Sequence, residues 1–389
     1  MKLAKESTSE SHMKVLHVFK TYLPDSMGGI QQCILQMSQA TAKLGIDNHV
    51  LSLSPNPQTG YDPGTHSVTQ CKTTLEFAST PVSLEAVSTF RRLAAEADLI
   101  HYHFPYPFAD LLHFLGQHNK PTLVTYHSDV VKQKYLLKAY QPLMHRFLQS
   151  VDRIVATSPN YVVSSQVLQR FRDKVDVVPI GLDPRSYPSV SINNVSKWQR
   201  RFGRRFFLFV GVLRYYKGLE TLLEAAEHSR LPIVIAGDGP LGESIREKAQ
   251  QARLHNVHFL GHVSENEKVE LLQACYAVVF PSDERSEAFG ISLLEGAMHQ
   301  KPLISCEIGT GTSYVNKLHE TGLTVPPKSP LKLAAAMELL WEHEEYAERM
   351  GCNAYQRFTE LFTAEKMADS YFHIYQTLLN SPETAAAGV

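Results

Sequence analysis

The sequence lacks the features of a membrane-spanning or secreted protein. No apolar run approaches the roughly 20 residues that a membrane-spanning helix needs, and no signal-peptide pattern precedes the first strand that we expect. The five cysteines are scattered and show neither a C-x-x-C pair nor a Cys/His spacing typical of zinc sites. We therefore expect a cytoplasmic protein whose cysteines are reduced.

Other absences narrow the function. The 38 basic and 39 acidic residues nearly balance, so no excess of positive charge indicates a nucleic-acid partner. No D-x-D sequence is present, which removes the usual carboxylate holder of a catalytic divalent metal. No G-x-G-x-x-G follows the first expected strand, which argues against a dinucleotide-dependent dehydrogenase.

The chain instead shows a repeated alternation of short apolar strands and helical patterns. Its 389 residues are enough for two α/β domains with separate cores. Strands are expected at 14–20, 50–53, 99–102, 122–126, 153–157 and 174–179, and again at 206–211, 232–236, 257–260, 276–280, 302–305 and 322–325. This alternation predicts an α/β fold of two doubly wound, Rossmann-like domains with parallel sheets.

A polar, proline-bearing linker sets the expected domain limits. We expect a first domain over residues 13–184, a second over 185–363, and a last helix over 364–380 that is long enough to cross back onto the first. The polar residues 1–12, MKLAKESTSESH, are expected to be sequence added before a native start at Met13.

The most informative stretch is SEAFGISLLEG, residues 286–296. Gly290 breaks a polar loop and an apolar helical pattern starts at Ile291. Glu287 therefore lies on the approach to a helix and Glu295 about one turn inside it. Backbone N–H groups at a helix start form an anion site, and the two carboxylates can bind sugar hydroxyls on either side, which suits a nucleotide sugar. The alternative is a buried helix with a capping Glu287 and a solvated Glu295.

Two cations follow the first expected strand of the second domain. Arg214 and Lys217 lie beyond Gly211, at the carboxyl edge of the sheet, where open α/β folds bind ligands. Fixed cations at this edge can offset the charge of a diphosphate without a metal. The alternative is that both are solvated loop charges.

Other strand ends of the second domain supply candidate contacts to a base. Gly237 lies in a strand-to-helix turn, and His262 and Val263 close the next strand at the same edge. Backbone groups there can read a base and the His262 ring can stack on it. The alternative for His262 is an exposed loop position without a role in binding.

The first domain supplies three candidates. Gly28 and Gly29 form its first strand-to-helix turn, where small residues let N–H groups approach a phosphate. His127 ends a later strand, so it is expected to face the cleft from the opposite wall. The alternatives are glycines that serve only the turn and a structural histidine.

In their order along the chain, the motifs resemble the retaining glycosyltransferases of family 4, which have the GT-B fold. They are GGI, TYHSD, VPIGLD, FVG, YYKG, AGDGP, FLGHV, EAFGISLLEG and TGLTVPP, and the likeness covers about residues 14–363. The resemblance implies an enzyme that transfers a hexosyl group from a nucleotide sugar, with two domains that face a cleft and close over the donor.

The resemblance also implies residue roles. Glu295 would bind the donor ribose, Glu287 the transferred sugar, and Lys217 with Arg214 the diphosphate. The implied donor-binding set is Gly28, Gly29, Gly211, Arg214, Lys217, Gly237, His262, Val263, Glu287, Ala288, Phe289, Gly290, Ile291 and Glu295, and the implied catalytic set is His127, Glu287, Lys217 and Arg214. The chain departs from many members at Val212, where they carry arginine, and we expect Arg214 to supply that charge.

Residues 305–316, SCEIGTGTSYVN, are similar to bacterial enzymes that add mannose or rhamnose to lipid-linked O-antigen precursors. The likeness implies a GDP-sugar donor, a sugar acceptor of the GlcNAc-diphospho-polyprenol type, and donor contacts from Thr310, Gly311 and Thr312. No metal or other cofactor is expected, because the fixed cations can stabilise the leaving diphosphate. No protein nucleophile is evident, so we expect front-face attack by the acceptor hydroxyl.

A basic amphipathic helix is expected over residues 131–147. Its lysines among apolar residues can bring the protein to the cytoplasmic face of the inner membrane as a peripheral protein, within reach of a polyprenyl-linked acceptor. The alternative is a charged outer face over a packed inner one. A second basic cluster, from Lys197 to Arg205, allows either a surface or a membrane role.

Several other functions stay open from the sequence. They are a UDP-sugar-dependent glycosyltransferase of another cell-envelope pathway, a GT-B sugar-nucleotide epimerase, a glycogen-type phosphorylase and a non-catalytic sugar-binding module. The epimerase needs a different acid/base set and the phosphorylase needs a pyridoxal lysine, and we find neither in the sequence. A binding module would bind the sugar without turnover.

Overall fold

The computed structural model describes residues 13–130 and 134–381, which form two compact units. The first unit comprises the chain up to Thr125, Lys138–Ile154, and the chain from Ala368 onward. The second comprises Tyr126–Leu137 and Val155–Met367. The predicted division at residue 184 falls inside the second unit, and the predicted domain limits stay a prediction.

A seven-stranded sheet carries most of the first half of the chain. Its strand order is β3-β2-β1-β6-β7-β8-β9. The strands are β1 (Met13–Val18), β2 (Ile46–Ser54), β3 (Ser67–Lys72), β6 (Leu99–Phe104), β7 (Thr122–Tyr126), β8 (Arg153–Ala156) and β9 (Val175–Val177), and β4 (Leu75–Phe77) and β5 (Thr80–Val82) form a separate hairpin. β1 pairs in parallel with β2 and β6, and Val15 lies opposite Leu99.

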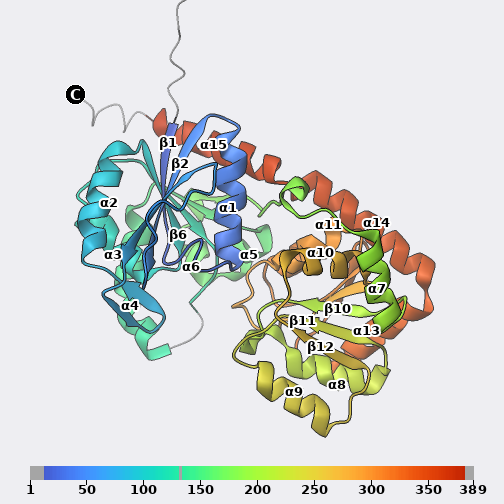
Figure 1. Ribbon diagram of the computed structural model, residues 1–389. Coiled ribbons are helices and arrows are strands. Elements are labelled where there is room, and N and C mark those ends of the chain that lie inside the picture. The colour runs from blue at the N-terminus through green and yellow to red at the C-terminus, as the bar shows by residue number, and fades with distance from the viewer. Residues whose placement is uncertain (1–12, 131–133, 382–389) are drawn as a thin grey trace, which may run out of the picture. The chain divides into compact units, whose positions relative to one another are not determined.

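Helices cover both faces of the sheet in the first unit. The helices of this half are α1 (Gly29–Ala42), α2 (Glu85–Glu96), α3 (Pro107–Leu115), α4 (Lys134–Ser150), α5 (Pro159–Ser164) and α6 (Gln166–Arg170). Figure 1 shows α2 and α3 on one side of β1 and β6, and α1 on the other. β6 is buried along its whole length, as expected for a parallel strand covered on two faces.

The second unit contains a six-stranded parallel sheet of order β12-β11-β10-β13-β14-β15. The strands are β10 (Phe207–Val210), β11 (Ile233–Ala236), β12 (Val257–Gly261), β13 (Ala277–Phe280), β14 (Leu303–Cys306) and β15 (Gly322–Val325). The helices are α7 (Ile192–Phe202), α8 (Leu219–Ser229), α9 (Gly242–Gln251), α10 (Glu265–Ala274), α11 (Ile291–Met298), α12 (Gly311–Val315), α13 (Pro330–Glu342) and α14 (Glu344–Leu361).

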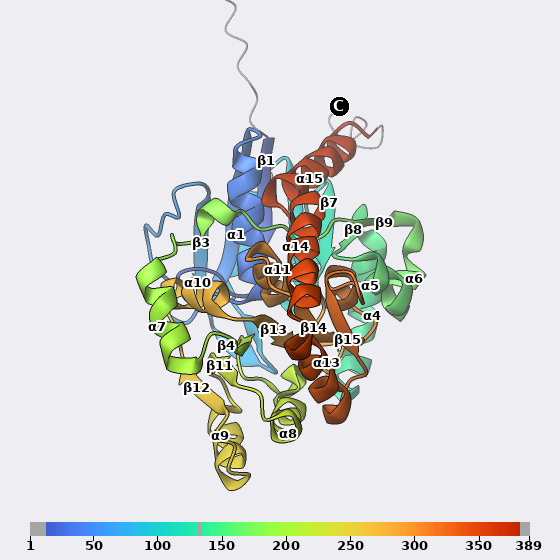
Figure 2. The ribbon, with the colours of Figure 1, turned by 90° about the vertical axis from the view of Figure 1, so that its right-hand side faces the viewer.

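The helices of the second unit enclose its core from both sides of the sheet. Figure 1 shows α8 and α9 on one side of β10 and β11, with α10 and α11 on the other, and Figure 2 shows α11 beside α14. Phe207, Leu222 and Met337 have no exposed surface and join β10, α8 and α13 in one apolar cluster. Burial of such side chains contributes roughly 1.5–3 kcal/mol each, which fixes the strand ends that carry the candidate site.

Helix α15 (Ala364–Leu379) begins in the second unit and continues in the first, as predicted for the last helix. In the first unit its Tyr371 hydroxyl lies 2.7 Å from Oγ1 of Thr125. One turn later, the Tyr375 hydroxyl lies 2.7 Å from Nδ1 of His101. Both tyrosines are buried, so these hydrogen bonds satisfy polar groups that burial would otherwise penalise.

Three buried histidines of the first unit, His17, His101 and His103, are the one group with metal-ligand potential in the described part of the chain. The rings of His101 and His103 stack at 4.5 Å with 22° between their planes. Both ring nitrogens of His101 already have hydrogen-bond partners, the Tyr375 hydroxyl and Thr125 Oγ1, each at 2.7 Å. His17 instead contacts His103 through Nδ1 at 3.1 Å and Asn48 through Nε2 at 3.0 Å, so the group is a hydrogen-bonded network.

The His17 network predicts acid sensitivity. Burial lowers the pKa of His17 from 6.5 to about 4, so between these values the unfolded chain binds a proton that the folded chain does not. His17 therefore contributes its full share to the free energy of unfolding above pH 6.5. As the pH drops towards 4, the free energy of unfolding falls by up to about 3 kcal/mol because of this group. Urea denaturation of wild type and His17→Gln between pH 7.5 and 4 checks this. Equal pH slopes for the two proteins would contradict it.

Candidate active site

The loops with the predicted site residues of the second unit lie at the carboxyl ends of neighbouring strands. β10 and β13 are adjacent although two strands separate them in sequence, and the strand order reverses between them. Such a switch point is the usual ligand position in open α/β sheets. The loop after β10 carries Gly211 to Lys217, and the loop after β13 carries Glu287, so the structure brings these two predicted segments together.

Gly237 shows how tightly the strand ends pack. Its φ of +138° lies in the region that favours glycine, and a Cβ there would lie 2.0 Å from the carbonyl oxygen of Gly211. Any other residue would push the loop after β10 away from β11. The predicted importance of Gly237 therefore has a structural basis in the close approach of two strand ends.

Lys217 and Glu287 form an ion pair at the switch point. Nζ of Lys217 lies 2.5 Å from Oε2 of Glu287, and both side chains are about nine-tenths buried. Ser282 Oγ donates to the same carboxylate oxygen at 3.2 Å, and Lys217 Nζ lies 4.6 Å from the centre of the Phe280 ring. A buried cation held by a carboxylate and an aromatic ring is a preorganised partner for a developing negative charge.

Glu295 is buried inside α11 and is held from two sides. Its Oε1 accepts hydrogen bonds from Nζ of Lys268 at 2.8 Å and from the hydroxyl of Tyr187 at 3.1 Å. Lys268 also pairs with Glu265 at 2.8 Å. Burial alone would lower the pKa of Lys268, but the two carboxylates outweigh it and raise that pKa above its usual value. The predicted alternative of a solvated Glu295 is therefore wrong.

The N-terminus of α11 is enclosed by the turn that precedes α12. Gly290 is the N-cap residue of α11 with a φ of +91°, and Phe289 before it is buried. The Gly311 N–H donates to the carbonyl of Ala288 at 2.7 Å, and a Cβ on Gly311 would lie 2.5 Å from the Phe289 ring. The turn and the helix start therefore hold each other.

Thr310 and Thr312 do not present free hydroxyls to a ligand. Both side chains are buried, and their hydroxyl oxygens lie 3.4 Å apart. Thr312 Oγ1 also donates to the carbonyl of Cys306 at 3.3 Å. This differs from the expectation that these hydroxyls contact the donor, because both are buried and bond to each other and, for Thr312, to the Cys306 carbonyl.

Arg214 and His262 lie at the surface of the second unit. Arg214 is exposed and precedes a short 3-10 turn, where its carbonyl accepts from the N–H of Lys217. Val212 is exposed as well, with 45% of its surface accessible. His262 is exposed and Val263 is half-buried beside it. The assignments of Arg214, His262 and Val263 stay predictions.

His127 follows β7 and belongs to the second unit. Its side chain is buried, and burial lowers its pKa to about 3. The imidazole is therefore neutral near pH 7 and can donate or accept a hydrogen bond without carrying charge. Gly28 and Gly29 belong to the first unit, where the Gly28 N–H donates to Oε1 of Gln31 at 3.2 Å and caps α1. Ligand roles for these residues stay predictions.

Four residues that hold the site were missed by the sequence analysis. Tyr187 and Lys268 hold Glu295, Ser282 holds Glu287, and Arg285 contacts the turn before α12 at the Gly309 carbonyl. The available sign that Tyr187 makes a specific contact was a large aromatic residue in an otherwise polar linker. Lys268 and Arg285 lie in charged stretches that give no sign of their partners.

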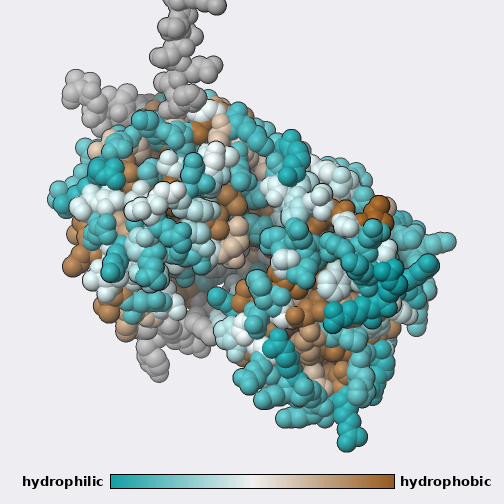
Figure 3. Space-filling view, viewed as in Figure 1, coloured by the Kyte–Doolittle hydropathy of each residue, from teal (hydrophilic) through white to brown (hydrophobic). Residues whose placement is uncertain are grey.

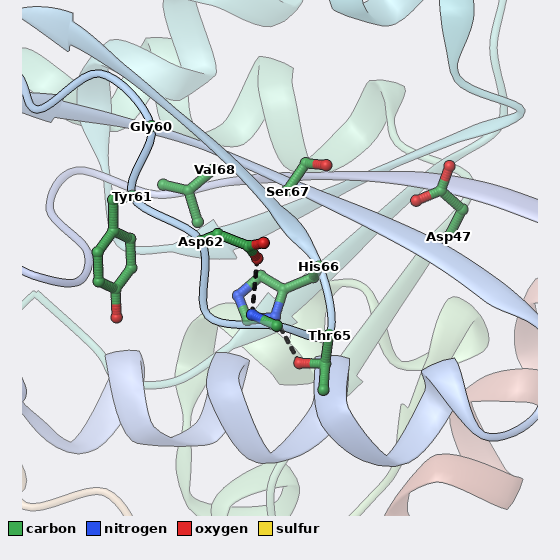
Figure 4. Close-up of a pocket in the computed structure, with 9 residues that line it drawn as sticks. Asp47, Gly60, Tyr61, Asp62, Thr65, His66, Ser67 and Val68 are labelled. Carbon is green, nitrogen blue, oxygen red and sulfur yellow. Dashed lines mark hydrogen bonds between the residues drawn. The ribbon is translucent and has the colours of Figure 1, made fainter.

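A cavity of about 410 Å³ lies in the first unit and includes none of the predicted site residues. Figure 4 shows Asp62 and His66 among its lining residues, with Thr65 Oγ1 3.1 Å from Nδ1 of His66. The Asp62 side chain accepts from the Gly64 N–H at 2.7 Å, and His66 contacts the Tyr22 hydroxyl at 3.0 Å. These bonds stabilise the loop itself, so the cavity does not change the choice of site.

Two basic helices bear on the predicted membrane contact. α4 spans Lys134–Ser150; residues 131–133 of the predicted helix lie outside the described residues. α7 has Lys197, Arg200 and Arg201 exposed on one face, and Figure 3 shows a hydrophilic surface over this helix. In the described ranges, no helix combines the length and the apolar character that crossing a bilayer requires.

Comparisons with known proteins identify the family. The profile described as Glycosyltransferase Family 4 matches residues 27–186, and the profile described as Glycosyl transferases group 1 matches residues 192–357. The chain is 55% identical over 353 residues to the D-rhamnosyltransferase WbpZ of Pseudomonas aeruginosa, covering 90% of this chain and 93% of the relative. It is 52% identical over 372 residues to the O-antigen chain mannosyltransferase C of Escherichia coli, covering 95% of this chain and 100% of the relative.

Solved structures give the fold. Sucrose-phosphate synthase from Thermosynechococcus elongatus superposes with a TM-score of 0.77 at 20% identity, covering 94% of this chain and 99% of that structure. At this identity the likeness shows the fold alone, which is GT-B, as predicted. The chain therefore belongs to the family 4 glycosyltransferases, and it is a glycosyltransferase.

Proposed function

We propose that the enzyme transfers mannose or rhamnose from a GDP-sugar to a lipid-linked sugar acceptor in O-antigen biosynthesis, with retention of anomeric configuration and without a metal. The observation that carries the transferase site is the buried Lys217–Glu287 pair at the switch point between β10 and β13. The names of the two relatives, above 50% identical over most of their length, support the sugar and the pathway.

The second unit offers a complete set of groups for the donor. In the proposed complex, the diphosphate meets Lys217, Arg214 and the N–H groups at the start of α11. The ribose hydroxyls donate to Oε2 of Glu295, because Lys268 and Tyr187 both occupy Oε1. The transferred sugar contacts Glu287 and the backbone of residues 288–291.

A carboxylate near the ribose position favours guanine over uracil. Glu265 shares Lys268 with Glu295, so Glu265 lies one contact away from the proposed ribose position. Guanine presents two adjacent N–H donor groups on one edge, whereas uracil presents one N–H flanked by acceptors. A carboxylate accepts both guanine donors and repels the uracil oxygens. This supports a GDP-sugar as the donor.

The chemical step releases a nucleoside diphosphate and leaves positive charge on the sugar. Lys217 and Arg214 stabilise the leaving phosphate oxygens, which is the task that a divalent metal performs in other transferases. His127 lines the reaction centre in this proposal. Because burial lowers its pKa, the imidazole is neutral and can hydrogen-bond to the transferred sugar without opposing the positive charge on it. The acceptor hydroxyl attacks the face from which the diphosphate leaves. The bond from the sugar to the acceptor oxygen forms as the bond to the phosphate oxygen breaks, and the hydroxyl proton passes to that departing oxygen.

In this proposal, the first half of the chain binds the acceptor and contacts the membrane. The side chains of Lys138 and Arg146 on α4 are exposed, and the Arg146 guanidinium lies 5.1 Å from the Phe114 ring centre. Basic residues near an anionic surface contribute about 1 kcal/mol each. We propose that α4 brings the enzyme to the inner membrane as a peripheral protein, where a polyprenyl-diphosphate-linked sugar is available.

The first test is a panel of GDP-, UDP-, dTDP- and ADP-sugars with and without EDTA. We expect the purified enzyme to bind and slowly hydrolyse a GDP-sugar, with rates unchanged by EDTA, because the leaving charge is met by side chains. Calorimetry and nucleotide release measure the two quantities. Preference for a UDP-sugar would contradict the donor, EDTA inhibition would contradict metal independence, and binding of none would contradict the site.

A further inference from the structure

Arg285 lies two residues before Glu287 and contacts three segments that are far apart in sequence. Its Nη2 donates to Oδ2 of Asp129 at 2.9 Å. Its Nη1 donates to Oγ of Ser164 at 2.9 Å and to the carbonyl of Gly309 at 3.1 Å. All four residues belong to the second unit. One half-buried guanidinium therefore joins the loop after β7, the end of α5 and the turn before α12.

The Asp129 end of this contact is rigid. Oδ1 of Asp129 accepts from the hydroxyl of Tyr126 at 2.9 Å and from Oγ of Ser165 at 2.7 Å, and its N–H donates to the hydroxyl of Tyr161 at 2.7 Å. The Arg285 guanidinium also lies 5.0 Å from the Tyr161 ring centre. Asp129 follows His127 by two residues in the loop after β7, so the contacts of Asp129 restrain the backbone that carries the buried imidazole.

The Gly309 end leads to the proposed sugar position. Gly309 begins the turn whose Gly311 N–H donates to the carbonyl of Ala288, the residue after Glu287. Ser164 Oγ donates to the same Gly309 carbonyl that Arg285 contacts. Arg285 itself lies in the segment before Glu287. Through the turn at Gly309 it also contacts the segment after Glu287 indirectly.

We propose that Arg285 is a positioning residue for glycosyl transfer, which fixes the loop that carries His127 in register with the loop that carries Glu287. This inference rests on the proposed function of that site. Arginine suits the role because its planar group supplies several donors in fixed directions, whereas a lysine ammonium is a single point. Among the described residues, neither Lys217 nor Glu295 has a hydrogen bond or ion pair with Arg285, so we expect a much smaller effect on nucleotide affinity than on kcat.

The test compares Arg285→Lys, Asp129→Asn and the double variant with wild type. We expect Arg285→Lys to lower kcat for sugar transfer by about 100-fold, the scale of a misplacement near 1 Å. The Kd for GDP and the KM for the donor should change by less than about threefold. The kcat of the double variant should be little lower than that of Arg285→Lys alone, because both substitutions break the same contact between Arg285 and Asp129.

Arg205→Lys is the matched control. The Arg205 side chain is 30% exposed, against 31% for Arg285, donates to the carbonyl of Trp341 at 2.9 Å and stacks on that ring at 4.1 Å. It lies in the same unit and contacts none of the predicted site residues. We expect this variant to keep wild-type kcat, and thermal unfolding of all variants shows whether each is folded.

Three outcomes would overturn the inference: kcat of Arg285→Lys within about twofold of wild type, additive losses in the double variant, or equal losses of kcat and GDP affinity. A folded Arg205→Lys with a similar loss of kcat would also overturn it, because any buried arginine would then have the effect. Failure of the proposed function is distinguished from failure of this inference by the wild-type enzyme, which would then transfer no sugar from a GDP-sugar.

Discussion

Replacing Lys217 with alanine is expected to lower kcat by about 100- to 1,000-fold, the usual cost of removing one group that stabilises developing negative charge. The proposed step transfers charge to the leaving diphosphate, and Lys217 is the buried cation of the site. Donor KM should change less than kcat, because Arg214 and the start of α11 still meet the ground-state phosphates. Steady-state transfer assays with the GDP-sugar measure both constants.

The controls for Lys217 separate charge loss from damage to the fold. Removal of the lysine leaves Glu287 buried without its partner, which by itself can cost about 3–5 kcal/mol of stability. Combining Lys217→Ala with Glu287→Gln removes that unpaired charge, so restored stability would trace the unfolding cost to the buried carboxylate. Glu287 is itself a proposed sugar contact, so the loss of kcat is assigned to Lys217 only where the double variant falls below Glu287→Gln alone. Lys248→Ala removes an exposed lysine that pairs with Glu220 in the same unit and should leave kcat unchanged. Near-normal turnover of Lys217→Ala would remove this residue from the reaction centre.

Replacing Glu295 with glutamine is expected to raise the Kd for GDP by about 10- to 100-fold. Hydrogen bonds to a charged acceptor contribute roughly 1.5–3 kcal/mol, and the proposed ribose contacts end on this carboxylate. The amide keeps the volume and the contact with the Tyr187 hydroxyl but loses the charge that Lys268 faces. Isothermal titration with GDP measures the change.

Glu243→Gln serves as the control for Glu295, because Glu243 is exposed on α9 of the same unit. Its GDP affinity should equal that of wild type. Binding of guanosine without phosphates should be weakened in Glu295→Gln to the same degree as GDP, since the contact is to the ribose. An unchanged Kd for both ligands would show that Glu295 serves the α11 packing alone.

Much of the fold was predictable because most of its parallel strands are short, largely apolar and buried runs. β7 and β15 have the predicted bounds, and α15 differs by one residue at its end. β3, β4 and β5 were missed. β4 and β5 have only three residues each, and β4 is exposed at all three positions, so its two apolar residues belong to no longer run. No helix was predicted over α7, because its anchors are tertiary: Trp198 and Asn194 both donate to the carboxylate of Glu270 on α10.

The site was predictable as a set of residues and not as a set of contacts. Lys217 and Glu287 were each identified from a local pattern, but their pairing follows from the adjacency of β10 and β13, which the sequence does not display. The same holds for Arg285 and Asp129, separated by 156 positions. Charged residues in loops look alike in a sequence, and only the strand order decides which of them meet.

The last helix constrains the order in which the chain can fold during synthesis. The first unit contains residues from near the start of the chain and also Tyr371 and Tyr375. A ribosome adds residues from the N-terminus at about 5–20 per second, so all residues of the second unit, which ends at Met367, are synthesised before most of α15. The side chains of His101 and Thr125 on the earlier strands therefore lack their tyrosine partners until Tyr371 and Tyr375 have been synthesised. A chain truncated after Met367 and released from the ribosome should consequently contain a protease-resistant second unit and a protease-sensitive first unit.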